Sequence, residues 1–329
     1  MKVGSEVNLT KRNHYNPCFW TAHWSPAYFD LVRRNGRSGA SVRDQKVYVL
    51  NVKSTKIYPS AVSDVHYDKG MGLAEITPEG AKGFCKRNFP GDYERFCEEM
   101  AARPEVLVLD FENILSCVES SDAYATLLEV IRKGHVGTLQ KKGHLSAFLA
   151  MHQLRSHSVM NSMVEFSELI GVPKFEHFWW LKHFISNADH MFEYAIRMAA
   201  GHWRFYRMDR DTFPLTDSPL LLQPSSLMIA LSPRLLLEID RTDRSCESGW
   251  TTINYISPAK LDEFRRRTIT NTFRQIIFGH KGMLEDWRMA PEFAERHAVM
   301  SDAKNYNAMV MKNPQGELWH VNAHANAMR

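Results

Sequence analysis

Hydrophobic and polar positions along the chain predict strands near both ends and helices in the middle. Residues 46–58 are rich in β-branched and aromatic side chains and end at Tyr58-Pro59-Ser60, which indicates a strand or a hairpin. Glycine and proline then recur between residues 60 and 78, so we expect a loop there. Residues 1–13 precede any such pattern, and we expect them to form an entry arm.

From about residue 79 to residue 200, apolar side chains recur every three or four positions, which is typical of amphipathic helices. One helix is expected over 122–133. The longest is expected over 141–170, because Gly171-Val172-Pro173 supplies a stop signal after it. A further helix, rich in aromatic residues, is expected over 175–200 and ends at Gly201.

After residue 201, short apolar runs separated by turns again predict strands, over 203–207, 219–223, 227–231 and 234–239. A helix is expected over 257–279, because Ser257-Pro258 offers an N-cap followed by a proline at the first helical position. A last hairpin is expected over 306–311 and 317–321.

Strands at both ends around a helical middle predict an α+β fold. In this fold a central helical layer, about 79–200, packs against a mixed or antiparallel sheet built from N-terminal and C-terminal strands. We expect one domain over 1–329. The alternative is a subdivision into a sheet-bearing part, 1–78 with 202–329, and a helical part, 79–201.

Composition sets limits on the class of protein. The 329 residues are 44% hydrophobic and 24% charged, which is ordinary for a globular protein, and the net charge of +4 is compatible with a nucleic-acid partner. Five dispersed cysteines without a CxxC pair are typical of reduced thiols in the cytoplasm. The start resembles no signal peptide, and no apolar run approaches ~20 residues, so we expect a cytoplasmic protein without a membrane span.

The most informative short motif is His14-Tyr15-Asn16-Pro17, in which an imidazole lies among turn formers and aromatic residues. A histidine can act as a general acid or base near neutral pH, and it can also contact a phosphate. The alternative is a histidine that caps a turn through its ring nitrogens. We take His14 as a candidate catalytic residue and Tyr15 as a candidate substrate contact.

Polar positions later in the chain complete the candidate site. Gln153 and Arg155 lie in a helical segment, where a guanidinium could hold a carboxylate or phosphate; the alternative is an ion pair with a neighbouring helix. Asp217 lies in a turn before an apolar strand, where it could serve as a base or simply form an Asx-turn. We therefore expect Arg155 and Asp217 to be catalytic, and Gln153, Asn271 and Arg274 to bind substrate.

Two further patterns suggest other chemistry. Arg197 and His202 have the spacing of the active-site signature of HEPN ribonucleases, although Gly201 interrupts the helix between them. A divalent metal is compatible with a set of histidines and carboxylates on two expected helices, namely His183, His190, Asp189, Glu193, Glu165 and Glu168. The alternative for the first pattern is chance, because the chain has 15 histidines and many arginines, and the alternative for the second is surface or packed histidines.

Basic runs and missing motifs further limit the functions that the sequence indicates. The runs 265–267 and 141–142 could contact phosphates, or they could simply be solvated helix faces. No P-loop, GxGxxG, GxSxG or HExxH motif occurs, so the cofactor stays unknown and neither a nucleotide nor a flavin is indicated.

The order of these motifs resembles the DUF4238 family of uncharacterised bacterial proteins. The opening 13–17 looks like the family's HYVP-type start, and Thr216-Asp217-Ser218-Pro219 is similar to its SDNP-like turn. The β-rich segment, the Gln153/Arg155 segment, Leu231-Ser232-Pro233 and the Asn271 helix follow in the same order, across roughly residues 12–280. The chain departs from the family pattern at Asn16, Cys18 and Ser218. The resemblance implies that the polar positions form one unit.

Three functional hypotheses follow from these residues. The first is a phosphodiester-cleaving hydrolase, a nuclease with RNA favoured, which could serve as a toxin or an antiviral (antiphage) defence effector. The second is a non-enzymatic sensor or binding module that holds an anionic ligand or a protein partner. The third is that the polar positions are structural and tie the N-terminal arm onto the helical layer.

Overall fold

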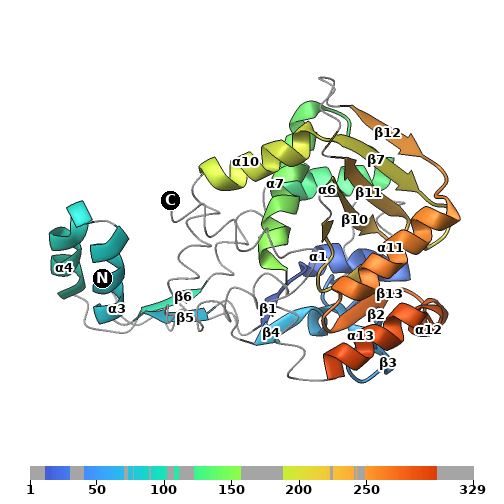
Figure 1. Cartoon of the computed structure of the whole chain (residues 1–329), viewed down its shortest axis with the longest axis horizontal. Coiled ribbons are helices and arrows are strands. Elements are labelled where there is room, and N and C mark those ends of the chain that lie inside the picture. Colours follow the sequence, from blue (N-terminus) through green and yellow to red (C-terminus); the bar gives the residue numbers. More distant parts are fainter. Residues whose placement is uncertain are drawn as a thin grey trace.

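The computed structural model describes residues 12–29, 41–69, 73–76, 78–88, 90–101, 107–110, 122–156, 188–222, 225–240, 242 and 249–301. Within them the chain forms an α+β fold with two larger sheets and helices around them, which confirms the fold class expected from the sequence (Figure 1). The helices in these ranges include none that is both long and apolar enough to cross a bilayer.

A four-stranded antiparallel sheet joins distant parts of the chain in the order β3-β2-β13-β8. Its strands are β2 (Lys46–Asn51), β3 (Ile57–Ala61), β8 (Leu215–Thr216) and β13 (Gln275–Phe278). Val47 and Val49 of β2 face the core, as the alternating pattern of a half-buried strand requires. The strand or hairpin expected over 46–58 is a hairpin of β2 and β3, and β2 also pairs with β13 from the C-terminal half.

The second large sheet has the order β12-β7-β11-β10-β9. Its strands are β7 (His202–Arg207), β9 (Leu221–Leu222), β10 (Ser226–Ser232), β11 (Leu235–Asp240) and β12 (Trp250–Ile253). The pairs are antiparallel except β12 with β7, which is parallel, so the sheet is mixed. Every residue of β10 is buried, because other elements cover both of its faces.

The N-terminal segment enters the core. After β1 (Arg12–His14) come α1 (Cys18–Thr21) and the short 3-10 helix η1 (Ala22–Trp24). Trp20 and Trp24 are fully buried, and their indole N–H groups donate to the carbonyl oxygens of Leu231 at 3.0 Å and Phe213 at 2.8 Å. These two side chains fasten the start of the chain to segments about 200 residues further on, with apolar contact and a satisfied donor.

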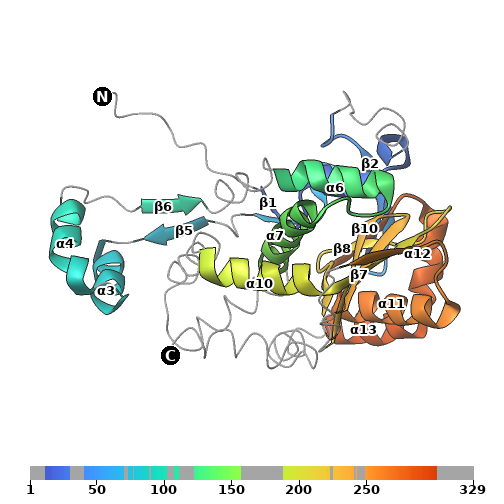
Figure 2. The same ribbon diagram turned by 90° about the horizontal axis from the view of Figure 1, so that it is seen from above.

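Helices of the middle of the chain pack against one another and against the second sheet. They are α6 (Asp122–Lys133), α7 (Leu139–Arg155) and α10 (Ala188–Ala200). Earlier in the chain, β5 (Leu73–Ile76) pairs with β6 (Leu107–Asp110). Between these strands lie α3 (Pro78–Asn88), η3 (Pro90–Asp92) and α4 (Tyr93–Ala101). The strand pair and its helices extend to one side of the molecule (Figures 1 and 2). The C-terminal helices are α11 (Pro258–Asn271), α12 (Lys281–Arg288) and α13 (Pro291–Ser301).

Three element boundaries expected from the sequence are wrong. The loop expected over 60–78 contains η2 (Val62–Asp64), β4 (Tyr67–Lys69) and β5. The helix expected to reach residue 170 ends at Arg155, because Ser156 turns extended and both its N–H and its hydroxyl donate to the Gln153 carbonyl.

The helix expected over 257–279 ends at Asn271, and residues 275–278 form β13. Their apolar, β-branched side chains complete the first sheet, so tertiary pairing outweighs the helical pattern. The helix over 122–133 and the end of α10 at Gly201 are confirmed. The expected hairpin over 306–321 lies outside the described residues.

Candidate functional site

His14, the expected catalytic imidazole, lies on β1 opposite Tyr67 of β4 and is half-buried. Its Nε2 is 3.2 Å from the Ser63 carbonyl oxygen, so this nitrogen carries the proton and donates. The ring also packs against Tyr67 at 5.7 Å between centroids. These contacts match the alternative in which the histidine secures a turn.

A buried polar network lies next to His14 and connects the N-terminal arm to β8 and β13 of the four-stranded sheet. Asn16 Nδ2 donates to the Thr216 carbonyl at 2.7 Å and lies 2.8 Å from His66 Nδ1. His66 Nε2 faces the Gln275 carbonyl at 3.4 Å, and the His66 N–H donates to the Gln275 side chain at 2.9 Å. These partners require the His66 tautomer that is protonated at Nε2. Burial lowers the pKa of His66 to about 3, so the ring is neutral at pH 7.

Asp217 is also buried, and both of its carboxylate oxygens are occupied. Oδ1 accepts the N–H of Phe273 at 3.0 Å, and Oδ2 accepts the N–H groups of Arg274 at 2.5 Å and Gln275 at 3.2 Å. Burial raises the pKa of Asp217 to about 6, although the three backbone N–H groups and the Arg274 charge act in the opposite direction. The carboxylate therefore closes the turn between α11 and β13.

Of the other residues expected in the site, some lie beside this network and others lie elsewhere in the fold. The N–H of buried Tyr15 donates to the His66 carbonyl at 2.7 Å, and Arg274 has an exposed side chain beside the Asp217 turn. Asn271 Nδ2 donates to the Arg267 carbonyl within its own helix at 2.9 Å. Gln153 is buried near the end of α7. Arg155 is the last residue of α7, and its side chain lies outside the described part of the structure.

The other sequence patterns take different forms in the structure. Arg197 is exposed at the end of α10, whereas His202 lies on β7 and contacts the Thr251 hydroxyl at 3.0 Å, so the two do not share one helix as the ribonuclease signature requires. Among the described residues there is no cluster of three His, Cys, Asp or Glu side chains that could hold a metal. His183, Glu165 and Glu168 lie outside those residues.

The two basic runs are partly buried rather than solvated. Lys142 is buried and its Nζ donates to the Gly201 carbonyl at 2.8 Å, while Lys141 pairs with Glu129. In the second run, Arg267 is buried and pairs with Glu263 of the same helix. Lys141 and Lys142 hold neighbouring elements together and Arg267 pairs within its own helix, whereas Arg266 is exposed, so neither run is a wholly solvated face.

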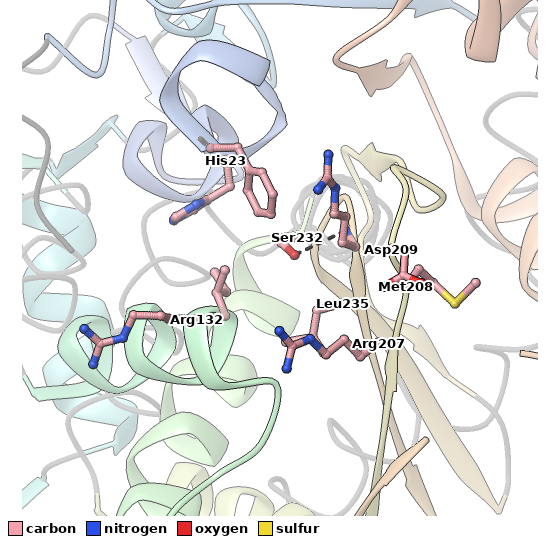
Figure 3. A pocket seen from close by; sticks show the side chains of 10 residues that line it. His23, Arg132, Arg207, Met208, Asp209, Ser232 and Leu235 are labelled. Atoms are coloured by element: carbon pink, nitrogen blue, oxygen red, sulfur yellow. Dashed lines mark hydrogen bonds between the residues drawn. The ribbon is translucent and has the colours of Figure 1, made fainter. Parts of the chain in front are cut away.

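A different set of residues lines a small hollow of about 60 Å³ between η1, the end of α6 and strands β7, β10 and β11 (Figure 3). Its lining is His23, Phe29, Ile131, Arg132, Arg207, Met208, Asp209, Ser232, Arg234 and Leu235. His23, Phe29, Ser232 and Leu235 are buried and form the inner part, whereas Arg132, Arg207 and Asp209 are exposed at the rim. The hollow thus has an apolar and imidazole floor under a charged rim.

His23 is fully buried on η1 and packs edge-on against Tyr28 at 5.4 Å. Among the described residues, neither of its ring nitrogens has a hydrogen-bond partner. Burial lowers the pKa of His23 to about 3, so the imidazole is neutral at pH 7 and offers one donor and one acceptor. A buried polar group without a partner costs roughly 1–3 kcal/mol, which marks His23 as a position to explain.

Arginine side chains provide the positive charge of the hollow. Within the described residues Arg132 and Arg207 make no ion pair, and Arg207 extends toward the centre of the hollow while Arg132 lies at its outer edge (Figure 3). Arg234 uses its Nε to donate to Asp211 at 2.6 Å and stacks over Phe29 at 5.2 Å. Its terminal nitrogens are left for another acceptor. Asp209 is the one carboxylate in the lining, so the net charge stays positive.

The end of α6 fixes the position of the rim. Gly134 adopts φ 77°, which favours glycine, and its N–H donates to the Val130 carbonyl at 2.7 Å, so the helix ends there. A Cβ on Gly134 would lie 3.1 Å from Cδ of Arg207. The glycine therefore lets the β7 arginine lie directly against the helix that carries Arg132.

Sequence reasoning missed this site. Its residues come from four segments that no spacing relates, and His23 stands in an aromatic run that reads as core. The only local signals were the arginine that ends the expected strand 203–207 and the Ser232-Pro233 turn before the next strand.

Comparisons of the chain with protein-family models, with curated proteins and with solved structures find no match. The resemblance to the DUF4238 family, and the shared role that it implies for the polar positions, therefore stay predictions.

Proposed function

We propose that the protein binds a small anionic ligand in the hollow lined by Arg132, Arg207 and Arg234, and that it acts as a binding or sensing module. The observation that carries the proposal is that three guanidinium groups line one hollow, and that two of them, Arg132 and Arg207, make no ion pair within the described residues. Guanidinium groups form bidentate, charge-assisted hydrogen bonds to oxyanions.

The hollow is also better suited to a ligand than the residues expected from the sequence. Asp217 has both oxygens occupied by backbone N–H groups, and His14 donates to a backbone carbonyl. Both contacts have a structural role, because the Asp217 carboxylate closes a buried turn and the His14 ring is held on the backbone beside Ser63. We identify no catalytic pair among the described residues, so the nuclease, toxin and antiviral hypotheses stay predictions.

Isothermal titration of the protein with inorganic phosphate tests the proposal. We expect saturable binding that weakens about tenfold or more in Arg207→Gln, because a hydrogen bond between charged groups contributes roughly 1.5–3 kcal/mol. We expect Asp209→Asn to tighten binding a few-fold, because it removes the carboxylate nearest the anion.

Arg266→Gln is the matched control, since it removes the same charge from an exposed position of α11, a helix that contributes no lining residue to the hollow. It should leave phosphate binding within about twofold of the wild type, a difference that screening at physiological salt allows. Equal losses in Arg207→Gln and Arg266→Gln would indicate non-specific attraction and would refute the proposed site, as would the absence of saturable binding.

A further inference from the structure

Two cysteines outside the hollow lie on neighbouring helices. Cys85 belongs to α3 and is buried, whereas Cys97 belongs to α4 and is half-buried, and each carries a thiol. We propose that these two thiols form a reversible oxidation site, at which a peroxide converts them into a disulfide that joins α3 to α4. The proposal depends on the geometry of the helical hairpin and is independent of the anion site.

The turn between the two helices brings the cysteines to the same level. The short helix η3 reverses the chain, and α3 and α4 pack side by side around it (Figures 1 and 2). Cys85 precedes Gly91, the middle of η3, by the same number of residues as Cys97 follows it. In an antiparallel helix pair, such positions lie opposite each other, because both helices rise by ~1.5 Å per residue.

Contacts of Tyr93 show which face of α4 meets α3. Tyr93 and Cys97 are four residues apart, so they share one face of their helix. The Lys86 ammonium of α3 lies over the Tyr93 ring, 5.9 Å from its centroid, so this face is turned toward the part of α3 that carries Cys85. A hydrogen bond with Cys97 raises the pKa of Tyr93. Burial and the charges of Asp92 and Cys97 raise the pKa of Cys85, so the two thiols are close enough to interact.

Facing positions on two packed helices suit a disulfide bond. The axes of packed helices lie ~8–10 Å apart, and each Cα atom lies about 2.3 Å from its own axis. Two facing Cα atoms are therefore roughly 4–6 Å apart, which overlaps the range of about 4.4–6.8 Å for disulfides. Cys85 and Cys97 can thus be joined while both helices keep their places.

The difference in exposure sets the order of the two chemical steps. Cys97 is the more exposed thiol, so its thiolate attacks an oxygen of hydrogen peroxide. The O–O bond breaks, the departing hydroxide takes up the thiol proton as water, and Cys97 becomes a sulfenic acid. The Cys85 thiolate then attacks the sulfenic sulfur, the S–O bond breaks, and a second water leaves with the Cys85 proton. Two thiols and one peroxide give one disulfide and two waters, and a dithiol reverses the change by exchange.

Peptide mapping of the whole protein after brief treatment with hydrogen peroxide tests the proposal. Remaining thiols are alkylated, and trypsin with a glutamate-specific protease then cleaves after Lys86, Arg95 and Glu98, so only a disulfide joins the two cysteine peptides. We expect peptides 83–86 and 96–98 to be linked at least about tenfold more often than any other cysteine pair, and dithiothreitol should separate them. Absence of this link, or equal amounts of other pairs, would overturn the proposal.

The same oxidation in urea separates the geometry of the hairpin from mere closeness along the chain. We expect the preference for this pair to fall several-fold in urea, because the unfolded chain no longer holds the thiols opposite each other. An unchanged preference would mean that the hairpin contributes nothing, and the proposed site would be wrong.

Serine variants test the order of the steps. In Cys85→Ser we expect Cys97 to stay as a sulfenic acid, which dimedone labels, because the second thiol is gone. Cys18→Ser is the matched control, since Cys18 is a half-buried thiol outside the hairpin, and it should give the linked peptides within about twofold of wild type. Loss of the link in Cys18→Ser, or no dimedone adduct at Cys97 in Cys85→Ser, would contradict the assignment.

Discussion

Two buried histidines show how partners decide the role of a residue. Burial lowers the pKa of both His23 and His66 to about 3, so each ring is neutral at physiological pH. Both ring nitrogens of His66 have hydrogen-bond partners, Asn16 and the Gln275 carbonyl. Its backbone adopts φ 52°, a left-handed conformation that is uncommon outside glycine. His66 is thus fixed by its partners, whereas the His23 nitrogens have none within the described residues.

Asp217 is the residue whose protonation should change stability with pH. Burial raises its pKa to about 6 in the folded state from the usual 3.8, so the folded protein binds this proton more tightly than the unfolded chain. Protonated Asp217 therefore adds to the free energy of unfolding in full below pH 3.8, and this contribution is lost as the pH rises through 6. At 1.36 kcal/mol per pKa unit, wild type should lose up to roughly 3 kcal/mol between pH 4 and pH 7 relative to Asp217→Asn.

Urea denaturation of both proteins at several pH values measures this difference. A difference that stays constant with pH, or that grows in favour of wild type as the pH rises, would mean that the three backbone N–H groups prevail over burial at Asp217.

At the scale of elements, the junction of α10 and β7 depends on a close approach of backbones. A Cβ on Gly201 would lie 2.6 Å from the Asp240 carbonyl oxygen of β11 and 2.7 Å from a methyl carbon of Ile239. Lys142 of α7 donates to the Gly201 carbonyl and lies over the Trp203 ring at 5.3 Å. This single residue therefore sets how the helical layer meets the second sheet.

Gly201→Ala should destabilise the protein by about 1–3 kcal/mol, because the strand backbone must move to accept the methyl group. Gly143→Ala is the matched control in the interior of α7, where a Cβ would meet nothing within 4 Å. Alanine has the higher helix propensity, so this variant should be up to about 1 kcal/mol more stable than wild type. Similar free energies of unfolding for the two variants would contradict the close contact at Gly201.

The elements also show what the sequence could and could not specify. The helix 122–133 follows from its helical spacing of apolar positions, and strands β2, β7, β10 and β11 follow from short β-rich or apolar runs bounded by turns. Ser156 ends α7 through its own hydrogen bonds, and β13 forms only because β2 and β8 lie ready to pair with it. Neither effect is visible in a hydrophobic pattern.

For the whole molecule, the N-terminal segment is the piece that completes both the core and the candidate site. Trp20 and Trp24 bring η1 against β10 and the segment before β8, and the same turn carries His23 to the hollow. Asn16 ties this segment to Thr216, which is 200 residues away in the chain. The meeting of the arm with the Asp217 bend was expected from the sequence, but the hollow was not, because its arginines become neighbours only in the assembled fold.

The central claim is that the arginine-lined hollow binds an anion, and isothermal titration of Arg207→Gln and Arg266→Gln with inorganic phosphate tests it most directly. We expect saturable binding that is about tenfold weaker in Arg207→Gln and nearly unchanged in Arg266→Gln. Equal affinities in the two variants would contradict the account.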